Sequence, residues 1–191
     1  FRYAQAQYAL KVELRGKIDS YIYPDADAKR AFIGTGNTNI AKPWRREIHL
    51  NKESWEGTLK HEIVHVLAGE FGMPVIHAHY NTGLVEGLAM VVDPDFGNRT
   101  LHEYAASMLK FRIIGDPGRL VRPTGFAAQS SSVSYVMMGS FIRFLIDRYG
   151  IVRFKSLYGG GSVDEVYGIP LERLGEEWTH YLSAVPVPDS W

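Results

Sequence analysis

Side chains that can hold a metal ion and move a proton occur together in five consecutive residues, His61-Glu62-Ile63-Val64-His65. On an α-helix, two histidines four residues apart lie one above the other on the same face, so both imidazoles can reach one ion. Glu62 is rotated by about a quarter of a turn from His61, so it can reach a water molecule on that ion without being a ligand. The spacing therefore predicts a metal site with His61 and His65 as ligands and Glu62 as general base.

The helix that carries this motif is predicted to be nearly buried. It begins after Ser54, a suitable N-cap residue, and extends to about Phe71, where Gly72 closes it and Pro74 follows. Its apolar stripe consists of Trp55, Leu59, Ile63, Val66 and Leu67, widened by Val64. Buried ionisable groups are costly unless they are paired or bound to metal, and a cation at the motif would supply that compensation. The alternative is two ordinary helix histidines, and it is disfavoured because this pentapeptide rarely arises by chance.

A third ligand is expected on the next helix, which we predict from about residue 83 to residue 92. A catalytic zinc ion takes three protein ligands and leaves one position open; because the chain has no cysteine, those ligands must be nitrogen and oxygen atoms. The helix contains one acidic residue, Glu86, within an apolar run. Gly87 and Ala89 are small, which would let this helix approach the histidine helix closely. The alternative for Glu86 is a side chain that reaches water or pairs with an arginine.

The two motifs together resemble the gluzincin metallopeptidases, which include thermolysin-like and aminopeptidase N-like enzymes. The resemblance rests on HEIVH at residues 61–65 and LVEGLAM at residues 84–90, because gluzincins place a glutamate ligand on the helix after the HExxH helix. Within that clan the chain is most similar to small bacterial peptidase MA-like domains. The likeness covers roughly residues 17–184, including segments at 135–150 and 167–178. It implies a zincin-like fold, a Zn²⁺ ion held by His61, His65 and Glu86, and a peptide or protein substrate.

The resemblance also implies two catalytic roles. Zinc would activate a water molecule and polarise the scissile carbonyl, and Glu62 would pass the proton of that water to the leaving amine. Aminopeptidase N-like members stabilise the tetrahedral intermediate with a tyrosine on a later helix, and Tyr135 is the matching residue here. The alternative for Tyr135 is a core tyrosine whose hydroxyl binds the backbone.

Two further family features concern the support of the metal and the binding of the substrate. Thermolysin-like enzymes place an aspartate four residues after the zinc glutamate to orient a histidine ligand, but this chain has Met90 there. Asp93, one turn further, is the predicted substitute, and metal affinity would be lower without it. Gluzincins also bind the substrate backbone along an edge strand of the N-terminal sheet. Here the predicted contact is Asn37, Thr38 and Asn39, with a plain glycine-rich turn as the alternative.

Strands are predicted early in the chain and helices later, which indicates an α+β fold. We predict strands at residues 8–14, 18–23 and 47–50, a helix at 25–32, and a turn-rich, then extended stretch at 34–42. Further helices are expected at 100–111, 132–149, 151–158 and 171–184, with a loop at 116–125 and a capping box of Ser162 and Glu165. No repeat or linker interrupts the chain, so we predict one domain over residues 1–191, with a small mixed sheet in about 1–52 and a mainly helical part in about 53–185.

The composition bounds the class of protein. The chain has 191 residues, 46% of them hydrophobic, which suits a globular protein with a sizeable core. Lys plus Arg and Asp plus Glu both number 21, so charge gives no case for nucleic acid binding. The most apolar stretch, residues 133–146, has a helical period and contains Arg143, so no membrane span is expected. Related domains are often found outside the cytoplasm or tethered to a membrane in bacteria, which favours such a location; the oligomeric state is left open.

The expected function is zinc-dependent hydrolysis of peptide bonds. The chain lacks the Gly-x-Met-x-Asn motif that aminopeptidase N-like enzymes use near the substrate amine, which favours an endopeptidase or a processing enzyme of narrow specificity. One alternative is a metal-binding module without turnover that serves protein interaction, and the presence of Glu62 beside three ligands argues against it. Another is zinc-assisted hydrolysis of a different amide. Of the other histidines, His77 and His79 are interpreted as solvated loop residues, with a place in the cleft or binding of a stray metal ion as the alternative. Surface or boundary positions are expected for His49, His102 and His180.

Overall fold

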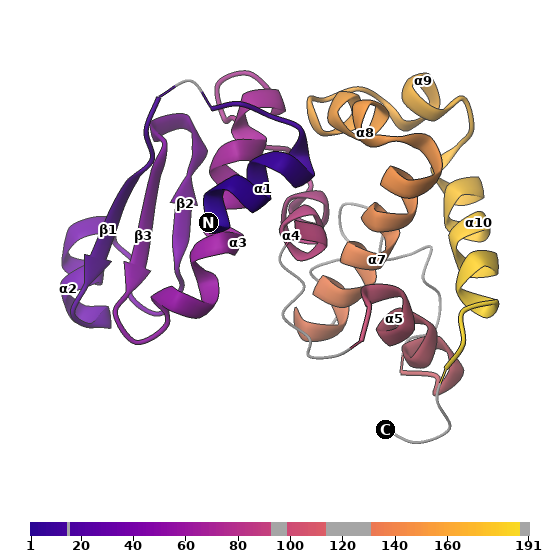
Figure 1. The fold of residues 1–191 in the computed structure, drawn as a ribbon, viewed down its shortest axis with the longest axis horizontal. Helices are drawn as coiled ribbons and strands as arrows, with labels where there is room; N and C mark the ends of the chain where they lie inside the picture. Colours follow the sequence, from indigo (N-terminus) through magenta and orange to yellow (C-terminus); the bar gives the residue numbers. More distant parts are fainter. Residues whose placement is uncertain (15, 93–98, 114–130, 188–191) are drawn as a thin grey trace. The chain divides into compact units, whose positions relative to one another are not determined.

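A three-stranded mixed sheet forms near the start of the chain (Figure 1). The computed structural model describes residues 1–14, 16–92, 99–113 and 131–187. Strand β3 (Glu47–Asn51) lies in the centre, parallel to β1 (Asp19–Tyr23) and antiparallel to β2 (Ile40–Lys42). Because β3 is central, its side chains are covered on both faces, and Ile48 and Leu50 are fully buried. The predicted strands at 18–23 and 47–50 and the extended end of 34–42 are confirmed.

The helix with the HExxH motif is held between this sheet and another helix. Residues Phe1–Ala78 form one compact unit, which contains the α-helices α1 (Arg2–Leu10), α2 (Ala26–Ile33) and α3 (Trp55–Ala68) and the 3-10 turns η1 (Pro43–Arg45) and η2 (Gly69–Phe71). Helix α3 packs against β3 and β2 on one side, and α1 packs against α3. Helix α2 packs on β1 and β3, and Asp25 caps it by accepting a hydrogen bond from the amide of Ala28 (2.8 Å). The motif therefore lies on a helix that is fixed by its neighbours.

The predicted strand at residues 8–14 is wrong, because residues Arg2–Leu10 form helix α1. The alternation of Tyr8, Leu10 and Val12 suggested a strand, but Tyr8 is 87% exposed. The buried side chains of α1 are Ala6 and Leu10, which are four residues apart and so lie on one helix face. A short stretch can satisfy both periods, and packing against α3 selects the helical one.

Ser54 lies at the N-cap position of α3, as predicted, but its side chain makes no capping hydrogen bond. Its hydroxyl instead accepts a hydrogen bond from the side-chain amide of Asn39 (2.9 Å). Helix α3 ends at Ala68 and continues as η2 to Phe71, and Gly72 is the C-cap residue there, as predicted.

Residues His79–Trp191 form a second compact unit, which is helical throughout its described part. Its helices are α4 (Thr82–Val92), α5 (Leu101–Lys110), α7 (Ser131–Tyr149), α8 (Ile151–Tyr158), α9 (Val163–Tyr167) and α10 (Leu171–Ser183). Helix α7 packs against α4, α5, α8 and α10 (Figure 1), and its buried face includes Phe141 and Leu145. The capping box of Ser162 and Glu165 is confirmed at the start of α9. The predicted helices and the coarse α+β class are thus present, and the predicted loop at 116–125 lies outside the described residues.

Glycines let α4 and α7 approach each other closely. A Cβ atom on Gly87 would lie 2.9 Å from the carbonyl carbon of Met138, and one on Gly139 would lie 2.9 Å from Cβ of Met90. The small size of Gly87 was expected to serve the approach to the histidine helix; within its own unit it also makes room for Met138 of α7. Gly87 therefore fixes the helix that bears Glu86 within its own unit.

Gly87→Val is expected to lower the free energy of unfolding by about 1–3 kcal/mol, because the added side chain overlaps the backbone of α7. The matched control is Gly57→Val on α3, where nothing lies within 4 Å of the added Cβ. The control is expected to change stability by less than about 0.5 kcal/mol. Urea unfolding of both variants tests this prediction, and equal midpoints for the two would contradict it.

In the part of the chain that the structure describes, no helix is both long and apolar enough to cross a membrane.

Candidate metal centre

The two histidines of the motif lie side by side on α3. Their ring centroids are 4.7 Å apart and their planes are nearly perpendicular, at 85°. His61 is half-buried, while His65 is buried, as are all residues from Glu62 to Ala68. This is the arrangement that a spacing of four residues gives on a helix, and it brings two imidazole nitrogens into reach of one ion.

Glu86 is half-buried in the second turn of α4. Its neighbours Leu84, Gly87 and Leu88 are buried. Among the described residues, His61, His65 and Glu86 form the one group of three potential ligands, with ligand atoms that all lie within 4.8 Å of one another. These are the three side chains that the sequence predicted as ligands.

The donor atoms of this group suit zinc. Two imidazole nitrogens and one carboxylate oxygen are the ligand types of catalytic zinc sites, and three protein ligands leave a fourth position open.

Glu62 is 6% exposed and lies directly after His61. The nearby positive charge is that of Lys29, a buried residue of α2. Burial lowers the pKa of Lys29, and the negative charge of Glu62 acts in the opposite direction. Glu62 is therefore a buried acid beside the ligands and within the field of a buried base.

The remaining predicted site residues are distributed over other elements. Tyr135 is half-buried in the second turn of α7, and its catalytic role stays a prediction. Asp93 lies outside the described residues. Asn37 and Thr38 are exposed in the bend that precedes β2, and Asn39 is half-buried. The strand at the sheet edge is Ile40–Lys42, so the predicted segment leads directly into it.

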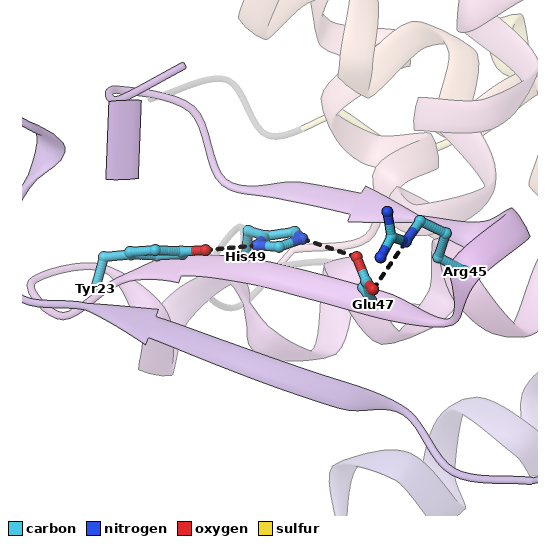
Figure 2. A network of polar contacts seen from close by, with 4 residues as sticks. All are labelled: Tyr23, Arg45, Glu47 and His49. Carbon is cyan, nitrogen blue, oxygen red and sulfur yellow. Dashed lines mark hydrogen bonds and ion pairs between the residues drawn. The ribbon is translucent and has the colours of Figure 1, made fainter. Parts of the chain in front are cut away.

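His49 was expected at the surface or at the boundary of the core, but it is 3% exposed and belongs to a chain of polar contacts (Figure 2). Its Nδ1 atom lies 2.9 Å from the hydroxyl of Tyr23, and its Nε2 atom lies 3.3 Å from the carboxylate of Glu47. Glu47 in turn accepts a hydrogen bond from Arg45 (2.9 Å), and the ring of Tyr21 stacks on that of His49 with centroids 5.0 Å apart. The position of His49 on the central strand explains its burial. The sequence signal for this contact was the alternation of Tyr21 and Tyr23 on the neighbouring strand β1.

His79 was expected in a solvated loop, but it is buried beside Tyr158, with ring centroids 6.2 Å apart. Its Nδ1 atom accepts a hydrogen bond from the amide of Asn81 (2.9 Å), and the side chain of Asn81 accepts one from the amide of Gly83. The segment that leads into α4 is therefore organised by His79. His77 and His180 are exposed, as expected.

His102 is half-buried, which agrees with a boundary position. Its Nδ1 atom lies 2.9 Å from the hydroxyl of Ser140, which also accepts a hydrogen bond from the indole of Trp178 (3.1 Å). These contacts link α5, α7 and α10 within the second unit.

Stability is expected to fall as the pH decreases below about 6.5, the ordinary pKa of histidine. Burial lowers the pKa of His49, His79 and His102, and for His49 the charge of Lys42 adds to this effect. The unfolded chain therefore binds more protons than the folded one just below that pH, which favours unfolding. Urea unfolding in the presence of a chelator, from about pH 7.5 to about pH 5.5, tests this, and a midpoint that stays constant or rises would contradict it.

Comparison with known proteins yields no match: no family model, no curated protein and no solved structure is similar to this chain. The function must therefore be inferred from the site itself.

Proposed function

We propose that this chain is a zinc-dependent peptidase in which His61, His65 and Glu86 hold the metal ion and Glu62 is the general base. The observation that carries the proposal is the group of three ligand atoms within 4.8 Å, with an additional buried carboxylate adjacent to the first ligand. A metal site that serves only stability has no use for this fourth residue, whereas hydrolysis requires it.

Each ligand has a defined role in the proposed site. The two imidazoles are fixed on one face of a helix that packs on both the sheet and α1, and the carboxylate of Glu86 completes a set of three. A zinc ion held in this way supplies an acidified water molecule and a Lewis acid for the scissile carbonyl.

Glu62 would accept the proton of the attacking water and deliver it to the leaving amine. It is close to the ligands in sequence, and its burial keeps bulk water from competing for the proton. Tyr135 is the proposed hydrogen-bond donor to the developing oxyanion, on the resemblance of its helix to the later helix of aminopeptidase N-like enzymes.

The substrate would bind in an extended conformation along β2. In the described part of the chain this strand lies at one edge of the sheet, pairs with β3, and packs against the motif helix α3. Addition of a peptide strand there would be held by backbone hydrogen bonds, with Asn37 and Thr38 at the entrance. A mixed sheet with an antiparallel edge strand, packed on the histidine helix and followed by a glutamate helix, supports the proposal of a zincin-like fold of the gluzincin type.

Removal and return of the metal test this function. The zinc-loaded protein is expected to cleave an unstructured peptide substrate, a chelator should abolish cleavage, and one equivalent of zinc should restore it. Binding of zinc without cleavage would instead support a non-catalytic interaction module. Cleavage that persists in the metal-free protein would contradict the proposal.

A further inference from the structure

A lysine is fully buried in the unit that carries the HExxH motif. Lys29, in the middle of α2, has an exposed fraction of 0%. Its ammonium group donates hydrogen bonds to the carbonyl oxygen of Thr38 (2.6 Å) and to Oδ1 of Asn39 (3.4 Å). A buried charge is costly unless it is hydrogen-bonded, and an apolar residue at position 29 could not make these two hydrogen bonds.

Asn39 connects Lys29 to three other parts of the unit. Its Nδ2 atom donates to the hydroxyls of Ser54 (2.9 Å) and Thr58 (2.6 Å), and its Oδ1 atom accepts from the amide of Asn51 (2.8 Å). With the contact from Lys29, both donors and both acceptor positions of the side chain are used. Asn39 therefore binds the end of β3 and the first turns of α3 rather than offering free groups to a substrate.

The hydrogen-bonded chain ends one turn before Glu62. Thr58 and Glu62 are four residues apart on α3 and so lie on the same face of the helix. The hydroxyl of Thr58 also donates to the carbonyl of Ser54 (3.0 Å), which fixes its orientation. The charge of Glu62 also acts on Lys29, so the two buried groups are linked electrostatically as well.

The same chain begins at the edge strand. Thr38 and Asn39 are the last two residues before Ile40, where β2 starts. Lys29 thus binds the segment that leads into β2, the strand along which the substrate is proposed to bind. Asn39 connects this segment to α3, the helix that carries Glu62.

We propose that Lys29 and Asn39 are positioning residues, which hold the start of β2 and the Glu62 turn of α3 in one fixed register. This inference rests on the proposed peptidase function, since a peptide bound along β2 would then meet Glu62 in a defined alignment. A displacement of about 1 Å at a reacting centre can cost about 100-fold in rate, so such a link between the two elements has a large effect.

The test compares Lys29→Met with Lys29→Arg, and uses Lys52→Met at an exposed position as the matched control. The Met variant is expected to bind zinc as the wild type does but to lose about 10- to 100-fold in kcat per bound zinc, with little change in KM. The Arg variant, which keeps the charge and donors, should recover part of the rate, and the control should match the wild type. A Met variant that folds, binds zinc and keeps its kcat would overturn the proposal.

Hydrogen exchange provides a readout that does not depend on activity. Lys29→Met should increase exchange at the amides of β2 and of the first turns of α3, while those of α7 stay protected. If Lys29→Met does not fold, Thr58→Val removes the hydrogen bonds of the Thr58 hydroxyl with Asn39 and with the Ser54 carbonyl, leaves the one between Asn39 and Ser54, and should give a smaller change of the same kind. Unchanged exchange in these segments would overturn the positioning role. If Lys29→Met increases exchange in these segments but the wild type never cleaves peptides, the peptidase function alone would be overturned.

Discussion

Glu62→Gln is expected to reduce peptide cleavage by about 100- to 10,000-fold while zinc binding stays intact, because general-base catalysis contributes a factor of this size. Glutamine has nearly the same shape as glutamate, so the buried position of residue 62 can accept it. It cannot accept the proton of the attacking water, and the ligands are unchanged. The loss should therefore appear in kcat rather than in metal content.

The matched control is Glu56→Gln, an exposed residue in the first turn of the same helix. It carries the same chemical change on α3 without access to the proposed reacting groups, and it should retain wild-type activity. The measurement is kcat and KM on an unstructured peptide, with bound zinc determined on the same samples. Full activity in Glu62→Gln would exclude Glu62 as the base, and an equal loss in both variants would show that the effect is not specific to it.

His65→Ala is expected to remove zinc binding at stoichiometric concentrations, and with it all peptide cleavage. The imidazole of His65 lies next to that of His61 and supplies one of three donor atoms, so its loss leaves a site with only two. A ligand that binds only the folded state stabilises it, by about 2.7 kcal/mol at a concentration 100 times its dissociation constant. The wild type should therefore gain several degrees in melting temperature when zinc is added, and the variant should gain none.

His180→Ala is the control, because His180 is exposed on α10 and has no expected metal role. It should bind zinc and gain melting temperature as the wild type does. A zinc-dependent gain that survives in His65→Ala would mean that the stabilising ion is bound elsewhere.

The proximity of the two candidate ligands on α3 could be predicted because their geometry is local. A spacing of four residues on a helix fixes the relation of His61 to His65 before any tertiary contact is known. Glu86 could be predicted as the third candidate ligand because a single acidic side chain in an apolar helix is costly unless it is paired or bound to a metal ion. The strands β1 and β3 were recognisable from their alternation, and α3 from its apolar stripe.

Features that depend on distant parts of the chain could not be predicted. His49 is buried because it lies on the central strand β3, and its ring nitrogen is hydrogen-bonded to Tyr23, which is 26 residues away in the sequence. Asn39 is half-buried and fully hydrogen-bonded because Lys29, Asn51 and Thr58 converge on it, although a glycine-rich turn suggested an open contact. The sequence shows these polar residues but not which of them meet.

The same limit explains one wrong assignment and one packing contact that the sequence did not show. In α1, the alternation of three apolar residues was compatible with a strand, and only the burial of Ala6 and Leu10 against α3 decides for a helix. For Gly87, the need for a close neighbour was evident, but the identity of that neighbour, Met138, is a property of the folded unit.

Anomalous diffraction at the zinc edge from crystals of the zinc-loaded protein tests the central claim most directly. One peak is expected, with His61, His65 and Glu86 each contributing an atom at about 2.0–2.2 Å. A strong peak coordinated by other residues, or no peak in a crystal grown with stoichiometric zinc, would contradict the claim that these three side chains share one ion.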